Sequence, residues 1–493
     1  MILEHLPALQ VVLPLVCAPL IVLVRRHGFA WLLATGVSWV SFAIAVLLAA
    51  RVVVTGPISY AIGSWPPPWG IEYRVDVLNA FVLVLVSLVG ALVMPYARRS
   101  VAAEIPREQV YLFFAMYCLC LAGLLGISIT GDVFNLFVFL EIASLSSYVM
   151  IALGQRRKAL VAAYQYLVMG TIGATFYVIG IGLLYLMTGT LNLADLAQRL
   201  AEVREIRPVV TALAFITVGI GLKLALFPLH QWLPNAYAYA PSVVTAFLAS
   251  TATKVSVYVL LRFYFVVFND RFVFDSLHFG DVLLVLSVLA ILTASLVAFF
   301  QPDLKRMFAY SSVAQIGYIT LGISLHNKAG LTGAVAHLFN HGITKGALFL
   351  LVGGIALRCG ETSFAHVAGL GKRMPLTSLG IVLAGLSLIG IPGTAGFITK
   401  WYLVLGSLDR HSWWLAALIV GSSLIAVGYV WRFVEAAYLQ SAAGSLPAPR
   451  EMPLSMLIPA WIMVAACIYF GLDTSFNLGF ARDAAALLLR GTP

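Results

Sequence analysis

Long apolar runs, separated by short polar breaks, fill almost the whole chain. A run of about 20 apolar residues is long enough to cross the hydrocarbon core of a bilayer as an α-helix. Taken between turn residues and charges, these runs predict about 14 transmembrane helices. The helices are expected at residues 6–24, 30–54, 76–96, 110–128, 132–153, 162–188, 209–229, 241–268, 281–300, 308–325, 331–357, 376–405, 412–439 and 453–471.

Two breaks inside apolar runs indicate an internal repeat. Pro228 interrupts the seventh predicted helix and Gly-Ile-Pro-Gly at 390–393 interrupts the twelfth, 164 residues later. Helices 4–8 and 9–13 therefore form two five-helix repeats, and an odd number of helices makes the second repeat inverted. Paired interrupted helices in inverted repeats are typical of a transport site. The predicted organisation is an N-terminal three-helix segment (1–100), a first antiporter-like repeat (108–268), a second inverted repeat (280–440) and a C-terminal helix and tail (441–493).

Two connections between the predicted helices have patterns of their own. Residues 55–73 combine several prolines with Trp65 and Trp69. This predicts an ordered interfacial loop or, as the alternative, a docking site for a partner. Residues 191–207 are amphipathic and predict a short helix along the membrane surface.

Composition agrees with this pattern. Of the 493 residues 61% are hydrophobic and 10% are charged, whereas soluble domains carry about 25% charged residues. The chain is therefore predicted to be an all-α polytopic membrane protein in a lipid bilayer. Its net charge of +10 comes from basic clusters at helix ends, which argues against a nucleic-acid partner. Lys and Arg are slightly more numerous in the loops after odd-numbered helices, which predicts a bacterial-type inner-membrane protein with both termini outside.

Ionisable side chains inside the predicted helices are the candidate functional residues. A charged side chain at the bilayer centre costs about 2.5–3.5 kcal/mol on insertion scales, so it is expected to face a polar cavity or a partner. His230 is a further candidate, because it lies in the proline-broken segment after the seventh helix. The residues inside helices are Glu141, Lys223, Lys254, His337, His341, Lys345, Lys400, Arg432 and Glu435.

Glu141 and Lys223 are predicted to form a pair. Six apolar residues precede Glu141, so its carboxyl group would have to be neutral or paired. The carboxylate of Glu141 as a partner would also explain why a lysine is tolerated at position 223, inside an apolar helix. We hypothesise a functional pair; the alternative is a structural ion pair that fixes helix packing.

His337, His341 and Lys345 lie at i, i+4 and i+8, on one stripe of a helix. The spacing of the histidines could suit a metal, but Leu338 replaces the glutamate of the zinc-protease signature and a third ligand is missing nearby. Histidine titrates near neutral pH, which favours a proton relay over a packing role or a metal site.

Lys400 follows the break at Pro392 by eight residues. It either terminates a polar line through the membrane or extends its amine to the interface. Arg432 and Glu435 are spaced i, i+3 and are expected to neutralise each other as a structural pair.

Together, these titratable groups predict a chain that hands protons laterally and releases them through half-channels. The sequence shows no catalytic triad, phosphate loop, haem or iron–sulfur motif. It therefore predicts a secondary transporter subunit rather than an enzyme, without a cofactor or a bound metal.

Four segments carry a family resemblance. GDVFNLFVFLEIASLSSY, LKLALFPLHQWLPNAYAYAPSVVTAFLASTATK, QPDLKRMFAYSSVAQIGY and HLFNHGITKGALF resemble the antiporter-like membrane subunits of Mrp-type Na+/H+ antiporters, respiratory complex I and membrane-bound hydrogenases. The form FNLFVFLEI is similar to the D-type subunit of the Mrp antiporters. The resemblance implies a subunit that moves protons against Na+ or K+ alongside other subunits of a membrane complex.

The resemblance also implies roles for individual residues. Glu141 and Lys223 would be the essential pair of a first half-channel, and Lys400 the lysine of a second. Lys254, with His337 and His341, would connect them. Asn235 departs from the family pattern, because an acidic residue is common there, and this puts a carboxylate-dependent role at that position in doubt.

Two other functions remain open. The chain could be a proton-pumping subunit of a complex I-like NADH-quinone oxidoreductase or a membrane-bound hydrogenase, and so part of a translocase. It could also be a scaffold that assembles a complex without conducting, although buried charges without a packing benefit argue against that role.

Overall fold

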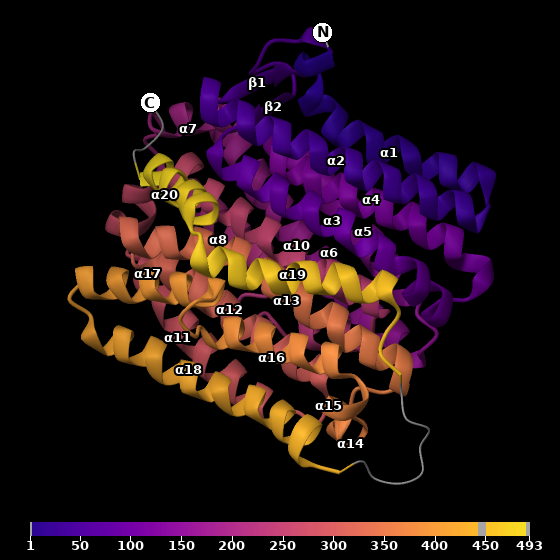
Figure 1. Cartoon of the computed structure of the whole chain (residues 1–493). Coiled ribbons are helices and arrows are strands. Elements are labelled where there is room, and N and C mark those ends of the chain that lie inside the picture. The colour runs from indigo at the N-terminus through magenta and orange to yellow at the C-terminus, as the bar shows by residue number, and fades with distance from the viewer. Residues whose placement is uncertain (1, 442–449, 490–493) are drawn as a thin grey trace.

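The computed structural model describes residues 2–441 and 450–489; the remainder of the predicted C-terminal segment, 442–449 and 490–493, lies outside the described residues. The described chain is a bundle of helices with one two-stranded antiparallel sheet (Figure 1). The first part comprises α1 (Leu6–Val24), α2 (His27–Thr55), β1 (Ile58–Ala61), β2 (Glu72–Val75), α3 (Val77–Glu104), α4 (Val110–Ile129), α5 (Val133–Ala152), α6 (Arg157–Thr188), α7 (Leu193–Leu200), α8 (Ile206–Leu224), α9 (Trp232–Tyr239) and α10 (Ser242–Leu261). The second part comprises α11 (Phe279–Phe299), α12 (Leu304–Ser324), α13 (Lys328–Cys359), α14 (Phe364–Val367), α15 (Leu370–Arg373), α16 (Pro375–Ile389), α17 (Ala395–Asp409), α18 (Trp413–Val434), α19 (Leu454–Leu472) and α20 (Ser475–Leu489).

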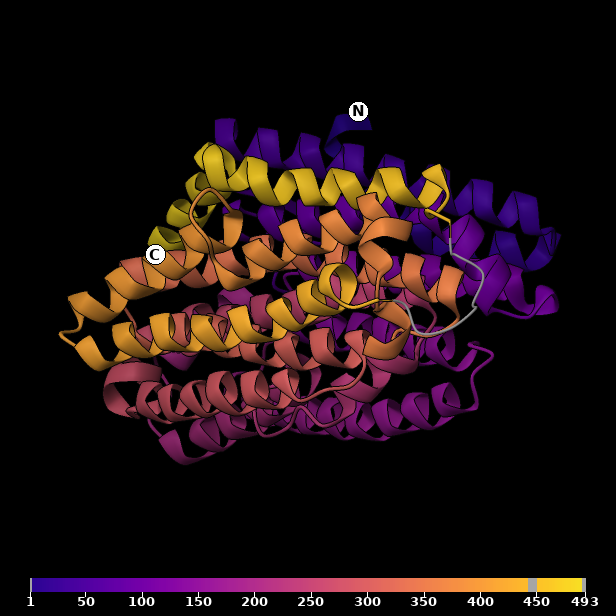
Figure 2. The ribbon, with the colours of Figure 1, turned by 60° about the horizontal axis from the view of Figure 1, so that its bottom comes forward.

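Every predicted membrane helix corresponds to a helix of the structure. Within the described residues, 12 helices are long and apolar enough to cross a membrane. The two remaining predictions correspond to α12, which begins with a pair of basic residues, and to the broken pair α16 and α17. The helices run side by side along one common direction (Figures 1 and 2). The prediction of an all-α polytopic membrane protein is confirmed.

Both predicted interruptions are present. Helix α8 ends before Ala225, which adopts a left-handed φ of 60°, and α9 resumes at Trp232. Helix α16 ends before Gly390, with φ of 87°, and α17 resumes at Ala395. Left-handed residues and prolines end the regular backbone ladder, so carbonyl groups at each break are free to accept other donors.

The two five-helix repeats share local detail. Asp132 caps α5 and pairs with Asn192 in an isolated β-bridge, and Asp303 caps α12 and pairs with Ser363 in the same way. Both members of the second pair follow the first by 171 residues. Helices α6 and α13 begin at the same offset, and each has 32 residues. The offset of about 170 residues expected from the sequence is therefore present in the fold.

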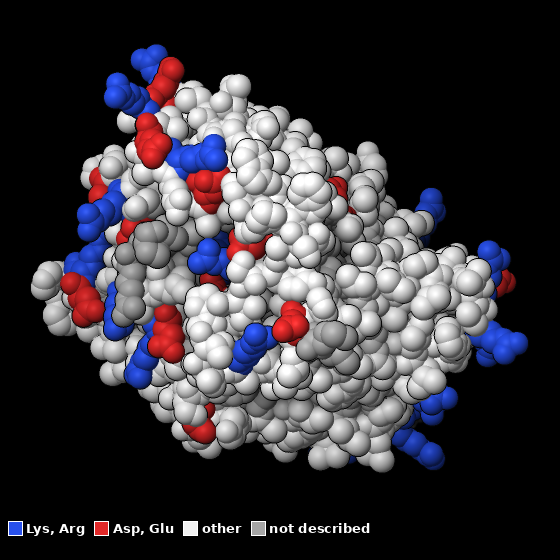
Figure 3. All heavy atoms as spheres, turned by 90° about the horizontal axis from the view of Figure 1, so that it is seen from above, with Lys and Arg blue, Asp and Glu red and all other residues white. Residues whose placement is uncertain are grey.

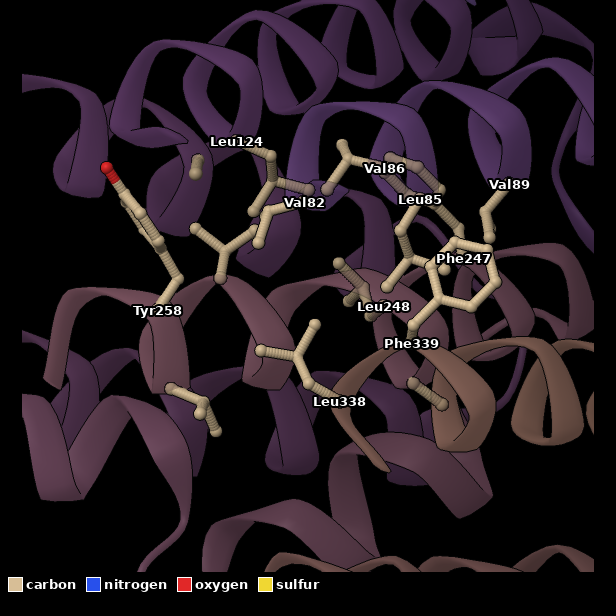
Figure 4. Close-up of a cluster of buried hydrophobic side chains, with 14 of the residues drawn as sticks. Val82, Leu85, Val86, Val89, Leu124, Phe247, Leu248, Tyr258, Leu338 and Phe339 are labelled. Atoms are coloured by element: carbon tan, nitrogen blue, oxygen red, sulfur yellow. The ribbon is translucent and has the colours of Figure 1, made fainter. Parts of the chain in front are cut away.

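Helices α10 and α13 form the centre of the bundle. They pack against each other, and α3, α12, α17, α19 and α20 surround them. Leucine, valine and aromatic side chains of α3, α4, α10 and α13 form an apolar cluster (Figure 4), in which the rings of Phe81 and Phe339 stack at 4.6 Å. Because both central helices are buried along nearly their whole length, the polar residues on them lie in the protein interior.

The ordered loop expected at 55–73 contains β1, which pairs with β2 as an antiparallel hairpin, and Trp65 and Trp69 are exposed. Helix α20 was not predicted, because Arg482 and Asp483 lower the hydropathy of its sequence. Its buried face is held by Asn477, whose side-chain amide donates to Asn340 on α13 at 2.9 Å. The expected surface helix is present as α7.

A buried ion pair anchors the start of α3. Arg262 donates to the Asp76 carboxylate at 2.6 Å, and the two side chains are 9% and 6% exposed. The same carboxylate caps α3 by accepting the backbone N–H groups of Leu78 and Asn79.

Replacing Asp76 with alanine is expected to lower the free energy of unfolding by about 3–5 kcal/mol, because the change leaves a buried guanidinium unpaired. Denaturant titration in detergent micelles would measure this loss, with exposed Asp483→Ala as the matched control. Equal stability of the two variants would contradict the anchoring role.

Candidate functional site

The first pair of predicted residues meets beside the break in α8. Lys223 lies in the last turn of that helix, where the helix dipole favours a cation. Its amine donates to Glu141 at 3.0 Å and to Ser144 at 2.6 Å, both on α5. The lysine side chain is 6% exposed, and that of Glu141 is 26% exposed at the surface of the single chain. The predicted Glu141–Lys223 contact is thus present in the structure.

Lys254 lies deeper, on α10. Its amine donates to the backbone carbonyl of Ala249 and to the hydroxyl of Thr253. The side chain is 1% exposed. Lys254 therefore lies inside the bundle, on the helix that packs against α13 and its histidine stripe.

His337, His341 and Lys345 lie on one stripe of α13, as predicted. The rings of His337 and His341 stack in parallel with centroids 5.5 Å apart. His337 shares a hydrogen bond of 2.8 Å with Thr399 on α17. One turn further along, Lys345 donates to the carbonyl of Phe308 at 2.8 Å and to Ser311.

The histidines have spare hydrogen-bonding capacity. Both ring nitrogens of His341 and the Nε2 atom of His337 are buried without a protein partner among the described residues. Buried polar atoms are nearly always hydrogen-bonded, to protein or to ordered water. The geometry therefore points to water molecules around the stripe, which a proton relay would need.

Lys400 lies at the second break. Its amine donates to the carbonyl of Ile389, in the last turn of α16, at 2.7 Å and to Ser423 at 2.8 Å. It also lies 4.8 Å from the ring centroid of Tyr318. Because the residue is 6% exposed, the alternative of an amine extended to the interface is wrong. Thr399, its neighbour in sequence, contacts His337 and so joins this site to the stripe.

His230 and Arg432 do not make the contacts expected of them. His230 is half-buried between α8 and α9, and its ring stacks on that of Phe227 with centroids 5.2 Å apart. It lies outside the network of polar contacts described above. The expected pairing of Arg432 with Glu435 is wrong: Arg432 donates to the carbonyls of Phe299 and Gln301. Backbone carbonyls at the end of α11 thus accept the hydrogen bonds of the Arg432 guanidinium.

Sequence reasoning missed two buried cations, Arg262 of the ion pair described above and Lys305. Lys305 was assigned to a loop, yet α12 begins before it and the residue is 3% exposed. The available signal was Asp303, a preferred helix-capping residue just ahead of the helix. Lys305 donates to Ser242, which in turn donates to Glu104.

Replacing Thr399 with valine is expected to slow transport about tenfold. The change leaves a buried nitrogen of His337 unpaired, which costs about 1–3 kcal/mol. A cost of about 1.4 kcal/mol corresponds to a tenfold lower rate. Ion exchange by the complex in proteoliposomes would measure the effect. Thr175→Val on the exposed face of α6 is the control; equal rates for both variants would show that the Thr399 contact is dispensable.

The fold and the site define a polytopic helical membrane protein with buried lysines at two helix breaks. Residues 130–426 match the family described as NADH:quinone oxidoreductase/Mrp antiporter, TM. The chain belongs to this family, and the resemblance to antiporter-like membrane subunits is confirmed.

Individual relatives come from both branches of the family. The chain is 44% identical to NADH-quinone oxidoreductase subunit N of Desulforudis audaxviator, over 95% of this chain and 96% of that protein. It is 29% identical to the D subunit of the Na(+)/H(+) antiporter of Bacillus subtilis, over 98% of this chain and 96% of that protein.

Two solved structures share the fold over nearly their full length. A chain of the Mrp complex from Dietzia sp. matches with a TM-score of 0.91 and 26% identity, covering 99% of this chain and 98% of that chain. A chain of the membrane-bound sulfane sulfur reductase, an archaeal respiratory membrane complex, matches with a TM-score of 0.90 and 29% identity, covering 98% of each.

Proposed function

We propose that this chain is the proton-translocating subunit of a multi-subunit Na+ or K+/proton antiporter of the cell membrane. The observation that carries the proposal is the row of buried lysines, Lys223, Lys254, Lys345 and Lys400. Three of them donate to neutral oxygens rather than to a carboxylate. A buried ammonium without a counter-ion is costly, so such a lysine exchanges its proton readily.

Glu141 would set the proton occupancy of Lys223. While the two groups are in contact, the carboxylate stabilises the ammonium by direct attraction. When the contact opens, the lysine loses its counter-ion and releases its proton towards Lys254 and the hydrated histidines. Lys400 would exchange with the other side of the membrane, using the carbonyl that the second break leaves free.

Partner subunits and orientation belong to the same proposal. The partial exposure of Glu141 would place a carboxylate against lipid in an isolated chain, which is costly, so another subunit would cover it. The relatives of known structure are chains of membrane complexes, which supports this arrangement. One end of the molecule displays mainly basic side chains, while the other end mixes both signs (Figure 3). The basic end would face the cell interior, with both termini outside.

A second function is favoured by the 44% identical relative, which belongs to an NADH-quinone oxidoreductase. In that case the same chain would pump protons within a complex I-like enzyme driven by electron transfer. It would then be a translocase subunit, without a redox cofactor of its own.

Isolation of the native complex distinguishes the two functions. For an antiporter, adding Na+ or K+ to vesicles is expected to dissipate an imposed proton gradient without an electron donor. Proton movement that appears only with NADH and a quinone, together with redox subunits in the isolated complex, would contradict antiport and support the second function.

A further inference from the structure

A cavity of about 270 Å³ opens at the basic end of the molecule. It lies where the end of α3, the connection after α5, the start of α10 and the end of α13 meet. Glu104, Arg156, Tyr239, Pro241 and Gly360 are among its lining residues. None of the residues with a transport role in the preceding section lines it, so it is a separate feature.

A chain of hydrogen bonds leads inward from this cavity. The hydroxyl of Ser242 donates to the carboxylate of Glu104 at 3.1 Å and accepts from the amine of Lys305 at 3.0 Å. The backbone N–H of Ser242 also donates to Glu104, at 2.9 Å. A hydroxyl that accepts on one side and donates on the other can pass a proton between its neighbours.

Helix α12 carries both Lys305 and a hydrogen-bond acceptor of a central lysine. Lys305 lies one turn before Phe308, whose carbonyl accepts from Lys345 at 2.8 Å. The hydroxyls of Ser311 and Ser312 donate to that same carbonyl, at 2.9 and 3.0 Å. Lys305 and the acceptor of Lys345 are thus one turn apart on α12, a gap that water would have to bridge.

An unpaired hydroxyl marks the same place independently. Tyr96 is fully buried, and its hydroxyl has no partner among the described residues. Tyr96 and Ser242 both pack against Gly353, where an added Cβ would overlap with each of them. A buried hydroxyl without a partner indicates a position for water, next to the Glu104–Ser242–Lys305 chain.

We propose that this cavity is an entrance for protons from the basic face, an inference that rests on the proposed function. Glu104 takes a proton from water in the cavity, and the Ser242 hydroxyl rotates so that it donates to the neutral amine of Lys305 and accepts from protonated Glu104. Ser242 then gives its proton to Lys305 while it takes the proton of Glu104, and this restores the hydrogen bonds of the structure, in which Lys305 donates to Ser242 and Ser242 donates to Glu104. Lys305 then passes a proton through water towards Lys345.

Blocking the cavity tests the entrance directly. Gln155 lines it and is exposed, so Gln155→Cys, in a Cys359→Ser background, can be labelled with a membrane-impermeant cationic methanethiosulfonate. Labelling the assembled complex is expected to slow proton transport at least about tenfold, a barrier of 1.4 kcal/mol. Lys372→Cys, exposed at the same end, is the control and is expected to keep its rate. An unchanged rate after labelling Gln155→Cys would overturn the proposal.

A conservative substitution separates proton transfer from packing. Arginine keeps the charge of Lys305 but does not give up its proton in proteins. Lys305→Arg is therefore expected to lose transport at least about tenfold, as Lys305→Met does, while Arg306→Lys keeps the wild-type rate. If Lys305→Arg transports like the wild type, Lys305 only holds the helices together.

The wild-type complex keeps the two proposals distinct. Absence of proton transport in the unmodified complex would count against the proposed function. Transport in the wild type that also survives labelling would count against the entrance alone. The labelling test needs only assembled complex, so it remains decisive if a Lys305 variant fails to fold.

Discussion

Replacing Glu141 with alanine is expected to abolish most cation/proton exchange by the assembled complex. The change removes the only carboxylate that the structure places against Lys223 among the described residues, at 3.0 Å. Leaving one member of a buried pair unpaired costs about 3–5 kcal/mol, which corresponds to a loss of about 100-fold or more. Dissipation of a proton gradient in proteoliposomes would measure the rate.

Two companion variants separate charge from packing. Glu141→Gln keeps the volume and a hydrogen-bonding oxygen but removes the charge, and it is expected to fail like alanine. Glu202→Ala removes a carboxylate from the exposed end of the connection after α7 and is expected to transport normally. A wild-type rate for Glu141→Ala in an intact complex would leave the pair with a structural role only.

Removing Lys223 and Lys400 together is expected to reduce transport to the background of protein-free vesicles. The two lysines lie at the two helix breaks, one in each repeat. Lys223 lies in the last turn of α8 and donates to Glu141, and Lys400 donates to the carbonyl of Ile389 in the last turn of α16. Losing both removes the group that exchanges protons at each break, so no alternative lysine at these positions can compensate. The single Lys223 variant is expected to lose about 100-fold by the same reasoning as for Glu141. The single Lys400 variant is expected to lose transport because it removes the amine that donates to Ile389 and Ser423 at the second break.

The double variant also tests whether the chain conducts at all. Lys328→Ala combined with Lys372→Ala removes two exposed lysines outside the buried row and serves as the matched control. Transport at the wild-type rate in the Lys223/Lys400 double variant, with the complex assembled, would identify the chain as a scaffold.

The helices and their breaks could be predicted because each depends on local sequence. A span needs about 20 apolar residues, and a break needs proline or a residue that tolerates positive φ, as at Pro228 and Gly390. Glu141 and Lys223 were predictable as partners for a related reason: each is a charge that apolar surroundings would otherwise penalise.

Two of the misses depend on contacts between segments that are distant in sequence. Arg432 has Glu435 one turn away, yet it binds carbonyls at the end of α11, because the last carbonyls of a helix have no donor within that helix. Lys305 looks like a loop residue until α3 and α10 bring Glu104 and Ser242 to it.

The sequence by itself determined that this is a polytopic helical membrane protein, with inverted repeats, paired breaks and a limited set of buried ionisable residues. Hydropathy, proline and charge act over a single helix, so they can be read along the chain. The tertiary structure alone decided which of those residues meet: it joined His337 to Thr399, turned Lys400 away from the interface and buried Lys305 against Ser242. Those outcomes depend on how α10, α12, α13 and α17 pack together. Helix packing brings into contact side chains that lie far apart in the sequence, and no local sequence pattern connects them.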